Sequence, residues 1–206
     1  MAKGIFITFE GSEGSGKSTQ INLIRAYLRE KKKDVLLVRE PGGVKISEKI
    51  RRILLDVKNV KMGKECETLL YMAARAQLVE EVIAPALREG KIVLSDRFLD
   101  STVVYQGYGS GVDVAVIKKI GAYATQNIQP DLTLVFDIDI KKAFSRLNRT
   151  KDRIEQRAVD YHQRVRNGYL SIAKKEPKRI KVIDCDRTRE AIHEDVKEYV
   201  RKLLKI

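Results

Sequence analysis

Residues 4–33 constrain the fold more than any other part of the chain, because an apolar run passes through a glycine-rich stretch directly into a helical pattern. The run GIFITF is typical of a buried strand. From residue 17 onward, Ile21, Ile24 and Leu28 stand at helical spacing. Glycine between the two lets the backbone turn tightly and approach a ligand closely. The segment predicts a strand, a tight turn and a helix whose positively polarised N-terminus faces an anion.

The turn matches the pattern G-x-x-x-x-G-K-[ST] through Gly11, Gly16, Lys17 and Ser18. In such a loop backbone N–H groups cradle phosphates, the lysine reaches the terminal phosphates and the hydroxyl binds Mg²⁺. An ordinary glycine-rich turn is the alternative, but average residue usage gives the pattern by chance in only about one per cent of chains of this length. We therefore expect the chain to bind a nucleoside triphosphate. The expected phosphate-binding residues are Gly11, Ser12, Glu13, Gly14, Ser15, Gly16, Lys17, Ser18 and Thr19.

Apolar strand-like runs alternate with helical segments along the whole chain. The runs are GIFITFE, DVLLVRE, KIVLSD, DLTLVFDI and IKVID. Helical periodicity fills residues 17–32, 44–57, 65–89, 112–126, 153–175 and 187–204. This alternation predicts an α/β fold, with a five-stranded parallel sheet covered by helices on both faces, in a single domain spanning residues 1–206. Pro85 interrupts the long helical segment, so we expect a kink or a fresh start there.

The net charge of +13 is concentrated between residues 141 and 181, where 14 basic and 4 acidic side chains occur. Such a patch suits nucleic-acid binding, a site that handles several phosphates, or a solvated lysine-rich surface. No segment resembles a nucleic-acid-binding motif and few aromatic residues interleave with the charge. We therefore do not expect nucleic acid as a partner.

Hydropathy and cysteine usage favour a cytoplasmic protein without a membrane partner. No apolar run approaches the roughly 18 residues of a membrane span, and the N-terminus leads straight into strand-like sequence rather than a signal peptide. Cys66 and Cys185 are far apart and form no C-x-x-C motif. We expect both to be buried reduced thiols.

Several motifs, in their order along the chain, resemble the thymidylate kinase family. They are EGSEGSGKSTQ, REPGG, LLYMAARAQ, LSDR followed by YQG, and DRIEQR. The resemblance covers nearly the whole chain. It implies a P-loop NTPase fold with a short lid at approximately residues 146–157. It also implies phosphoryl transfer from ATP to dTMP with Mg²⁺, and a homodimer.

Asp96 and Arg97 follow the third apolar run, at the edge of the sheet where folds of this class bind ligands. The aspartate can hold a Mg²⁺-bound water or orient the acceptor, and the arginine can grip a phosphate with its guanidinium fork. A structural ion pair at the strand end is the alternative. The resemblance implies that Asp96 is catalytic or linked to the metal, with Ser18 as the other metal contact. It also implies that Arg97 grips the acceptor phosphate.

Tyr71 and Arg75 are four residues apart in a helical segment and therefore share a helix face. The spacing alone favours a core tyrosine and a surface arginine. The resemblance instead implies that Tyr71 lies against thymine, Arg75 near its O4 and Tyr105 beneath the deoxyribose. We assign the neighbouring Val103 and Val104 to helix packing. The implied dTMP-binding residues are Glu13, Tyr71, Arg75, Arg97, Thr102, Tyr105 and Gln106.

The variable positions of the glycine loop carry Glu13 but no basic residue, although phosphoryl transfer needs positive charge on the equatorial oxygens. The segment RLNRTKDRIEQR resembles the lid of kinases whose catalytic basic residues lie there. Glu13 is then expected to face the acceptor sugar near its 3′-hydroxyl. The expected catalytic residues are Lys17, Asp96, Arg97, Arg149 and Arg153. The other basic residues of the lid fit a solvated helix terminus: Arg146, Lys151 and Arg157.

Two positions depart from the family pattern and affect peripheral acceptor contacts. Val44 stands where the family usually has threonine, and Ser110 where relatives commonly carry arginine. The nearest functional alternative is a kinase for another nucleoside monophosphate or for a deoxynucleoside. A regulatory P-loop protein without turnover comes next, and a basic nucleic-acid-binding ATPase is third. The Glu40–Pro41 bond can be cis, because X–Pro bonds tolerate that isomer cheaply.

Overall fold

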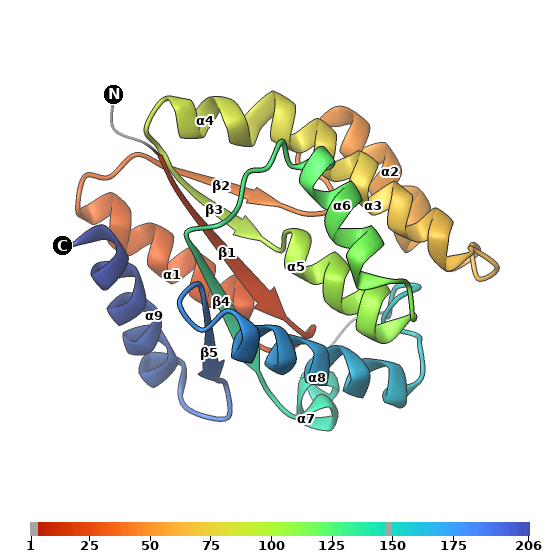
Figure 1. The fold of residues 1–206 in the computed structure, drawn as a ribbon. Helices are drawn as coiled ribbons and strands as arrows, with labels where there is room; N and C mark the ends of the chain where they lie inside the picture. Colours follow the sequence, from red (N-terminus) through yellow and green to blue (C-terminus); the bar gives the residue numbers. More distant parts are fainter. Residues whose placement is uncertain (1–3, 147–149) are drawn as a thin grey trace.

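The central sheet is parallel and five-stranded, as the sequence predicts. The structure is a computed structural model and describes residues 4–146 and 150–206. The strand order β2-β3-β1-β4-β5 places β1 in the middle, where it pairs with β3 and β4 (Figure 1). The strands are β1 Ile5–Gly11, β2 Val35–Arg39, β3 Ile92–Asp96, β4 Leu132–Asp137 and β5 Ile180–Asp184.

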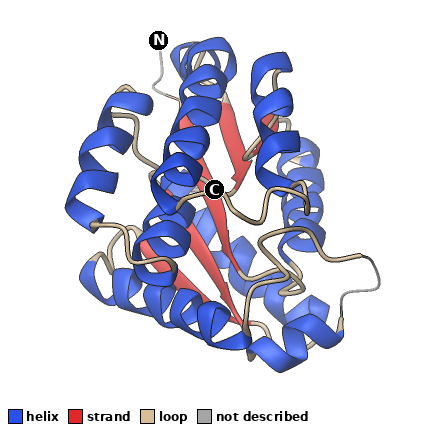
Figure 2. Cartoon of the chain, turned by 90° about the vertical axis from the view of Figure 1, so that its right-hand side faces the viewer, coloured by secondary structure: helices blue, strands red, loops and turns tan. Residues whose placement is uncertain are grey.

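Helices cover both faces of the sheet, which runs between them in Figure 2. They are α1 Lys17–Glu30, α2 Lys45–Leu55, α3 Lys64–Leu78, η1 Val79–Ile83, α4 Ala84–Arg88, α5 Leu99–Thr102, η2 Val103–Gly109, α6 Val114–Ala124, α7 Ile140–Ser145, α8 Val159–Lys175 and α9 Arg189–Leu204. Each helical segment expected from periodicity is present. In the part of the chain that the structure describes, no helix is both long and apolar enough to cross a membrane.

Two helical segments were not expected from the sequence. Residues 99–109 form α5 and the π-helical η2, although glycine disfavours a helix. Packing overrides that preference, since a Cβ added to Gly109 would lie 2.6 Å from the ring of Tyr161. Val103 and Val104 are buried here, so their assignment to helix packing is confirmed. The other is the short α7, which is capped by Asp139, whose carboxylate accepts hydrogen bonds from two backbone N–H groups of the first turn.

The interruption expected at Pro85 is confirmed. The helix that starts as α3 widens into the π-helical turn η1 and continues as α4, with Pro85 in the first turn of α4. Proline has no N–H to donate to the carbonyl four residues before it. A π-helix is rare and occurs mostly as a single turn inside an α-helix, as it does here before Pro85.

The start of α8 differs from the prediction. Helical periodicity suggested a helix from residue 153, but α8 begins at Val159 and residues 153–157 form a turn. Asp152 explains the turn, because its carboxylate accepts hydrogen bonds of 2.9 Å from the N–H groups of Ile154 and Glu155. An aspartate bonded to nearby backbone offers the chain an alternative to the helix.

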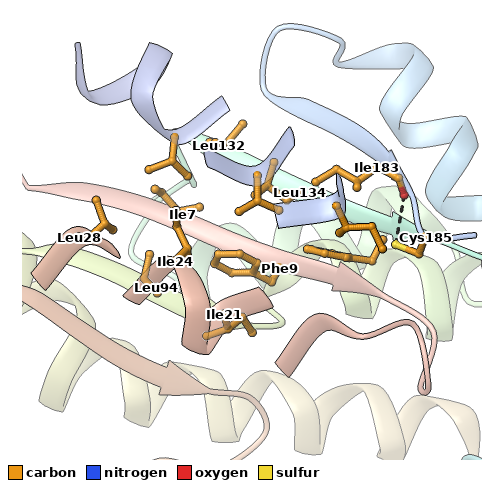
Figure 3. Close-up of a cluster of buried hydrophobic side chains, with 14 of the residues drawn as sticks. Ile7, Phe9, Ile21, Ile24, Leu28, Leu94, Leu132, Leu134, Ile183 and Cys185 are labelled. Carbon is orange, nitrogen blue, oxygen red and sulfur yellow. Dashed lines mark hydrogen bonds between the residues drawn. The ribbon is translucent and has the colours of Figure 1, made fainter. Parts of the chain in front are cut away.

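The largest apolar core lies between the sheet and the layer formed by α1 and α9. Ile7 and Phe9 point from β1 into this core, where they meet Ile24 and Leu28 of α1 (Figure 3). The helical spacing expected in α1 is therefore confirmed. Phe6, one residue out of phase, packs into a second cluster with η1 and α4 on the opposite face. Side chains of a strand alternate between faces, so β1 joins both layers.

The two cysteines have different environments. Both thiols are free, and Cys185 is buried in the α1–α9 core, where its thiol lies 3.4 Å from the carbonyl oxygen of Ile183 (Figure 3). Cys66 is exposed, so the expectation that it is buried was wrong. Cys66 lies in the first turn of α3, and the buried side of that turn is formed instead by Glu67 and Thr68.

We expect Leu28→Ala to lower the free energy of unfolding by about 2–5 kcal/mol, because Leu28 is fully buried and its truncation leaves a cavity. Urea unfolding of the ligand-free protein measures this loss. Val159→Ala is the control, since Val159 is 51% exposed at the start of α8. Equal stabilities for the two variants would contradict this description of the core.

Candidate active site

The loop after β1 and the segment after β3 both leave the sheet at the carboxyl ends of these neighbouring strands (Figure 1). A cavity opens there between them. This is the edge at which α/β sheets bind their ligands. Residues expected to bind the donor and residues expected to bind the acceptor line this same cavity. They are Glu13, Lys17, Ser18, Tyr71, Asp96, Arg97, Thr102, Tyr105 and Gln106.

The glycine loop has a backbone that other residues adopt with difficulty. Gly11 and Gly14 have φ angles of 128° and 73°. A Cβ on Gly14 would collide with the carbonyl oxygen of Ala143, so the loop rests directly on α7. The first turn of α1 contains no acidic residue, and Gly16 caps it without a side-chain hydrogen bond. The N–H groups at this helix end therefore have no side-chain cap, as an anion site requires.

The side chain of Lys17 is hydrogen-bonded to the backbone of its own glycine loop. Its ammonium donates hydrogen bonds of 3.1 and 2.7 Å to the carbonyl oxygens of Gly11 and Ser12. Burial lowers the pKa of Lys17, and the nearby Arg97 adds to that effect. Neutral carbonyl acceptors hold a charged donor less strongly than a phosphate would. The lysine is thus oriented for an anion in the loop.

Ser18 and Asp96 supply hard oxygen atoms at one side of the cavity. The Ser18 hydroxyl lies 3.5 Å from a carboxylate oxygen of Asp96. Mg²⁺ prefers such oxygens and usually keeps several waters and substrate phosphates as its remaining ligands. Residues 4–146 and 150–206 contain no cluster of three or more His, Cys, Asp or Glu side chains that could hold a metal alone. Ser18 and Asp96 together suit a Mg²⁺ ion whose remaining ligands are water molecules and the oxygens of a bound phosphate.

Glu13 and Arg97 form an ion pair of 2.5 Å between the glycine loop and the segment after β3. The Arg97 guanidinium also lies over the ring of Tyr105, 5.0 Å from its centre. The backbone of Arg97 is left-handed, with φ of 72°, which is uncommon for a non-glycine residue, and its side chain lines the cavity. Glu13 of the glycine loop therefore contacts Arg97, a residue expected to bind the phosphate of the acceptor.

Arg75 lies behind the cavity wall rather than at its surface. Its Nε donates to Glu40 at 2.7 Å, and another nitrogen donates to the Phe98 carbonyl and to the Thr102 hydroxyl. Arg75 is 2% exposed, so the surface arginine that spacing alone favoured is wrong. Tyr71 does line the cavity, and burial raises its pKa. A contact between Arg75 and an acceptor base stays a prediction.

Two arginines of the predicted lid, Arg153 and Arg157, contact Glu67 of α3. Arg153 is buried, ion-paired with Glu67 at 2.6 Å, and donates to the Leu54 carbonyl. Arg157 pairs with the same carboxylate oxygen at 2.6 Å and donates to Ser110. The expectation that Arg157 is solvated was therefore wrong. Arg149 lies outside the described residues, so its catalytic role and that of Arg153 stay predictions.

The two positions that depart from the family pattern have structural roles. Ser110 accepts a hydrogen bond from Arg157, as described above. Val44 packs against the cluster of Phe6, and its carbonyl accepts the first helical hydrogen bond of α2. The Glu40–Pro41 bond is cis, as the sequence allowed.

Sequence reasoning missed several residues that line cavities at the sheet edge. Arg39 and Arg51 line the same cavity as Lys17 and Arg97. The signal for Arg39 is its place at the start of the REPGG motif, at the end of the second strand. Arg51 lies within α2, and its sequence context carries no comparable signal. His162 also lines this cavity. A second cavity lies beside the glycine loop, and its charged lining residues are Arg146, Arg187 and Arg189.

Comparison with known proteins agrees with this geometry. The family model "Thymidylate kinase" matches residues 9–196. The thymidylate kinase of Kosmotoga olearia is 47% identical over 205 residues, which cover 98% of both chains. That of Halothermothrix orenii is 45% identical over 207 residues, 98% of this chain and 99% of the relative. The crystal structure of thymidylate kinase from Ehrlichia chaffeensis matches with a TM-score of 0.79 and 35% identity, covering 96% of this chain and 99% of that one. With its P-loop and its parallel sheet, the chain belongs to the thymidylate kinase family of enzymes.

Proposed function

We propose that the protein transfers the terminal phosphoryl group of ATP to dTMP, giving ADP and dTDP. The observation that carries this proposal is the cavity in which the P-loop lysine meets Asp96, Arg97 and an aromatic acceptor wall. A regulatory protein that only binds a nucleotide needs the glycine loop but not the aromatic acceptor wall. A single domain with a lid at residues 146–157 performs the reaction.

The acceptor nucleotide lies between Tyr71 and the arginines of the cavity. Arg97, with Arg39 and Arg51, grips its phosphate, since guanidinium forks match phosphate oxygens. Tyr71 lies against the thymine ring and Tyr105 beneath the deoxyribose, with Thr102 and Gln106 as polar contacts. Glu13 faces the 3′-hydroxyl, and its ion pair with Arg97 supports its placement on the acceptor side of the cavity.

Positive charge around the transferring group performs the catalysis. Lys17 turns from the carbonyls of its own loop toward the terminal phosphates, and the N-terminus of α1 faces them as well. Mg²⁺, held through Ser18 and Asp96, would neutralise charge on the phosphate oxygens when bound. Arg153 reaches the phosphates only after its pair with Glu67 opens, so a lid rearrangement accompanies closure. Closure excludes water, which would otherwise accept the phosphoryl group.

The cavity lined by Arg146, Arg187 and Arg189 suits the donor base. It adjoins Ser15, Gly16 and Thr19 at the phosphate loop, which is where a triphosphate bound to the loop would continue. Guanidinium planes can stack on an aromatic base. ATP, the donor that membership of the family implies, is the donor that we propose for this cavity.

The protein acts as a cytoplasmic homodimer. The dimer is supported by apolar side chains that stay exposed on three adjacent helices, α2, α3 and α6. Exposed apolar side chains mark protein interfaces where they gather in one patch, and the packing of α2 and α6 against α3 brings the helices that carry these side chains together. The side chains are Ile46, Ile53, Leu69, Val116 and Tyr123. A second copy of the chain is the proposed occupant of this face.

ADP production, measured with each deoxynucleoside monophosphate in turn against a control without acceptor, tests the proposed reaction. We expect the highest kcat/KM with dTMP. A higher value with another monophosphate would favour the nearest alternative, a kinase for that nucleotide. No acceptor-dependent ADP at all would favour a nucleotide-binding regulator. Acceptor-independent turnover with steeply salt-dependent DNA affinity would favour a nucleic-acid-binding ATPase.

We expect Lys17→Ala to lower kcat by roughly 10²- to 10³-fold, because a charged contact made in the transition state is lost. The coupled assay for ADP at saturating substrates measures this loss. Lys31→Ala, at the other end of α1, is the matched control and should keep full activity. A Lys17→Ala variant within twofold of the parent enzyme would remove Lys17 from the mechanism.

We expect Arg75→Ala to lower the free energy of unfolding by about 3–5 kcal/mol, because it leaves the buried Glu40 carboxylate without its ion-pair partner. Urea unfolding measures this loss, with Arg29→Ala on the exposed side of α1 as the control. The preference for dTMP over dCMP is measured in parallel. An unchanged preference would restrict Arg75 to the support of the wall, whereas a lost preference would indicate the predicted contact with the base.

We expect Leu69→Glu to convert the dimer to a monomer, because a charge on a 54%-exposed apolar position must be desolvated in the interface. Sedimentation velocity at micromolar concentration measures the change. Val159→Glu, on α8 and outside this face, is the control and should leave the dimer intact. A monomeric parent protein, or a Leu69→Glu variant that sediments like the parent, would contradict the proposed interface.

A further inference from the structure

Glu10 is a fully buried carboxylate that contacts Ser101, a residue lining the proposed acceptor site. It lies in β1, immediately before the glycine loop, and does not line the cavity. One oxygen accepts a hydrogen bond of 2.8 Å from the backbone N–H of Phe98. The other accepts from the hydroxyls of Ser101, at 2.5 Å, and Tyr169, at 2.9 Å. None of the functions assigned above uses this residue.

The two hydroxyls that donate to Glu10 also contact Arg97. A guanidinium nitrogen of Arg97 lies 3.2 Å from the Ser101 hydroxyl and 3.3 Å from the Tyr169 hydroxyl. A guanidinium can only donate, so both hydroxyls must present lone pairs to it. Each hydroxyl has one proton, and that proton must therefore point elsewhere.

Glu10 is the acceptor toward which these two hydroxyl protons point. A carboxylate is the strongest acceptor near the two hydroxyls and accepts without donating. The hydroxyls also lie 2.9 Å apart, so Tyr169 can donate to Glu10 directly or through Ser101. In both arrangements the protons run toward Glu10 and the lone pairs face Arg97. Burial raises the pKa of Glu10 to about 7, with Asp100 adding to the rise, while Arg97 and the two hydroxyls oppose it.

The backbone of Arg97 is fixed by the same part of β1. Its N–H donates to the carbonyl of Phe9 at 3.0 Å, and the next N–H, of Phe98, donates to Glu10. The left-handed φ of Arg97 is unfavourable for a non-glycine residue and persists because neighbouring contacts impose it. Glu10 therefore restrains Arg97 at both its main chain and its side chain.

We propose that Glu10 is a positioning residue for the acceptor site, which holds Arg97 in place by orienting the hydroxyls of Ser101 and Tyr169 and by anchoring the turn at Phe98. This inference rests on the proposed role of Arg97 as the grip for the dTMP phosphate. Glu10 itself does not touch the nucleotide.

Glu10→Gln tests the proposal because it keeps the shape and removes one acceptor. If the amide NH₂ faces the hydroxyls, it donates to them and turns their protons toward Arg97. If it faces Phe98, two donors oppose each other and the turn shifts. Loss of a negative charge near a phosphate site would, by charge alone, tighten dTMP binding. A weaker binding of dTMP therefore reports lost positioning.

We expect Glu10→Gln to raise the KM for dTMP about tenfold, as for a displaced charged hydrogen bond, and to leave the KM for ATP within about twofold. The assay is run at about pH 8.5, where a carboxyl with a pKa near 7 is ionised. Thr8→Val is the matched control, because Thr8 is buried on the same face of β1 and bonds to Thr133 instead. Thr8→Val should change neither the KM for dTMP nor the KM for ATP. An unchanged or lower KM for dTMP in Glu10→Gln would overturn the proposal.

A double-mutant cycle that combines Glu10→Gln with Arg97→Ala separates the positioning of Arg97 from a general loss of structure. In the Arg97→Ala background, Glu10→Gln should add less than about twofold to the KM for dTMP, since interacting sites are not additive. An equal effect in both backgrounds would overturn the proposal. If Arg97→Ala alone left the KM for dTMP unchanged, the acceptor role of Arg97 would fail, and this inference with it.

Tyr169→Phe decides the matter where Glu10→Gln does not fold. It removes one oriented hydroxyl without a change of charge, and phenylalanine retains the shape of the ring. We expect it to raise the KM for dTMP about threefold, the effect of losing one ordinary hydrogen bond. A KM for dTMP equal to that of the parent enzyme would overturn the proposal.

Discussion

The site depends on the parallel pairing of β1 with β3 and β4. This pairing sets Phe9 opposite Asp96 and Gly11 opposite Phe136, so the glycine loop leaves the sheet beside the Asp96–Arg97 turn. Alternation along β1 sends Ile7 and Phe9 into the α1–α9 core. Residues one position out of phase, such as Glu10, face the opposite layer, which carries the acceptor wall. One strand thereby holds the donor loop and supports the acceptor site.

Buried glutamates hold arginines throughout the acceptor side of this basic protein. Glu40 pairs with Arg75 behind the wall, and Glu67 pairs with Arg153 in the lid. Burial raises the pKa of Glu40 to about 7, although Arg75 opposes the rise. Such pairs do not reliably add stability, but breaking one leaves a buried charge without a partner. Their effect here is to restrict where each guanidinium can point.

Glu67 also connects residues 153–157, part of the predicted lid, to the proposed acceptor wall. One of its oxygens accepts from the side chain of Gln106, and the other contacts Arg153 and Arg157. Gln106 lines the cavity, so withdrawal of an arginine from Glu67, as proposed for lid closure, would alter the surroundings of a residue in the proposed acceptor wall. Residues of the predicted lid and of the proposed acceptor site therefore share one buried carboxylate.

The sequence by itself determined the elements that local rules control. The spacing of Ile21, Ile24 and Leu28 predicted α1, the glycine pattern predicted the phosphate loop, and apolar runs predicted the parallel sheet. The order of the motifs identified the family. The tertiary structure decided what depends on partners distant in the chain. Arg75 is buried because Glu40 lies beside it, and residues 99–109 are helical because their glycines pack closely against other side chains. Periodicity carries no information about such partners, since burial and pairing of a polar side chain are set by what folds against it.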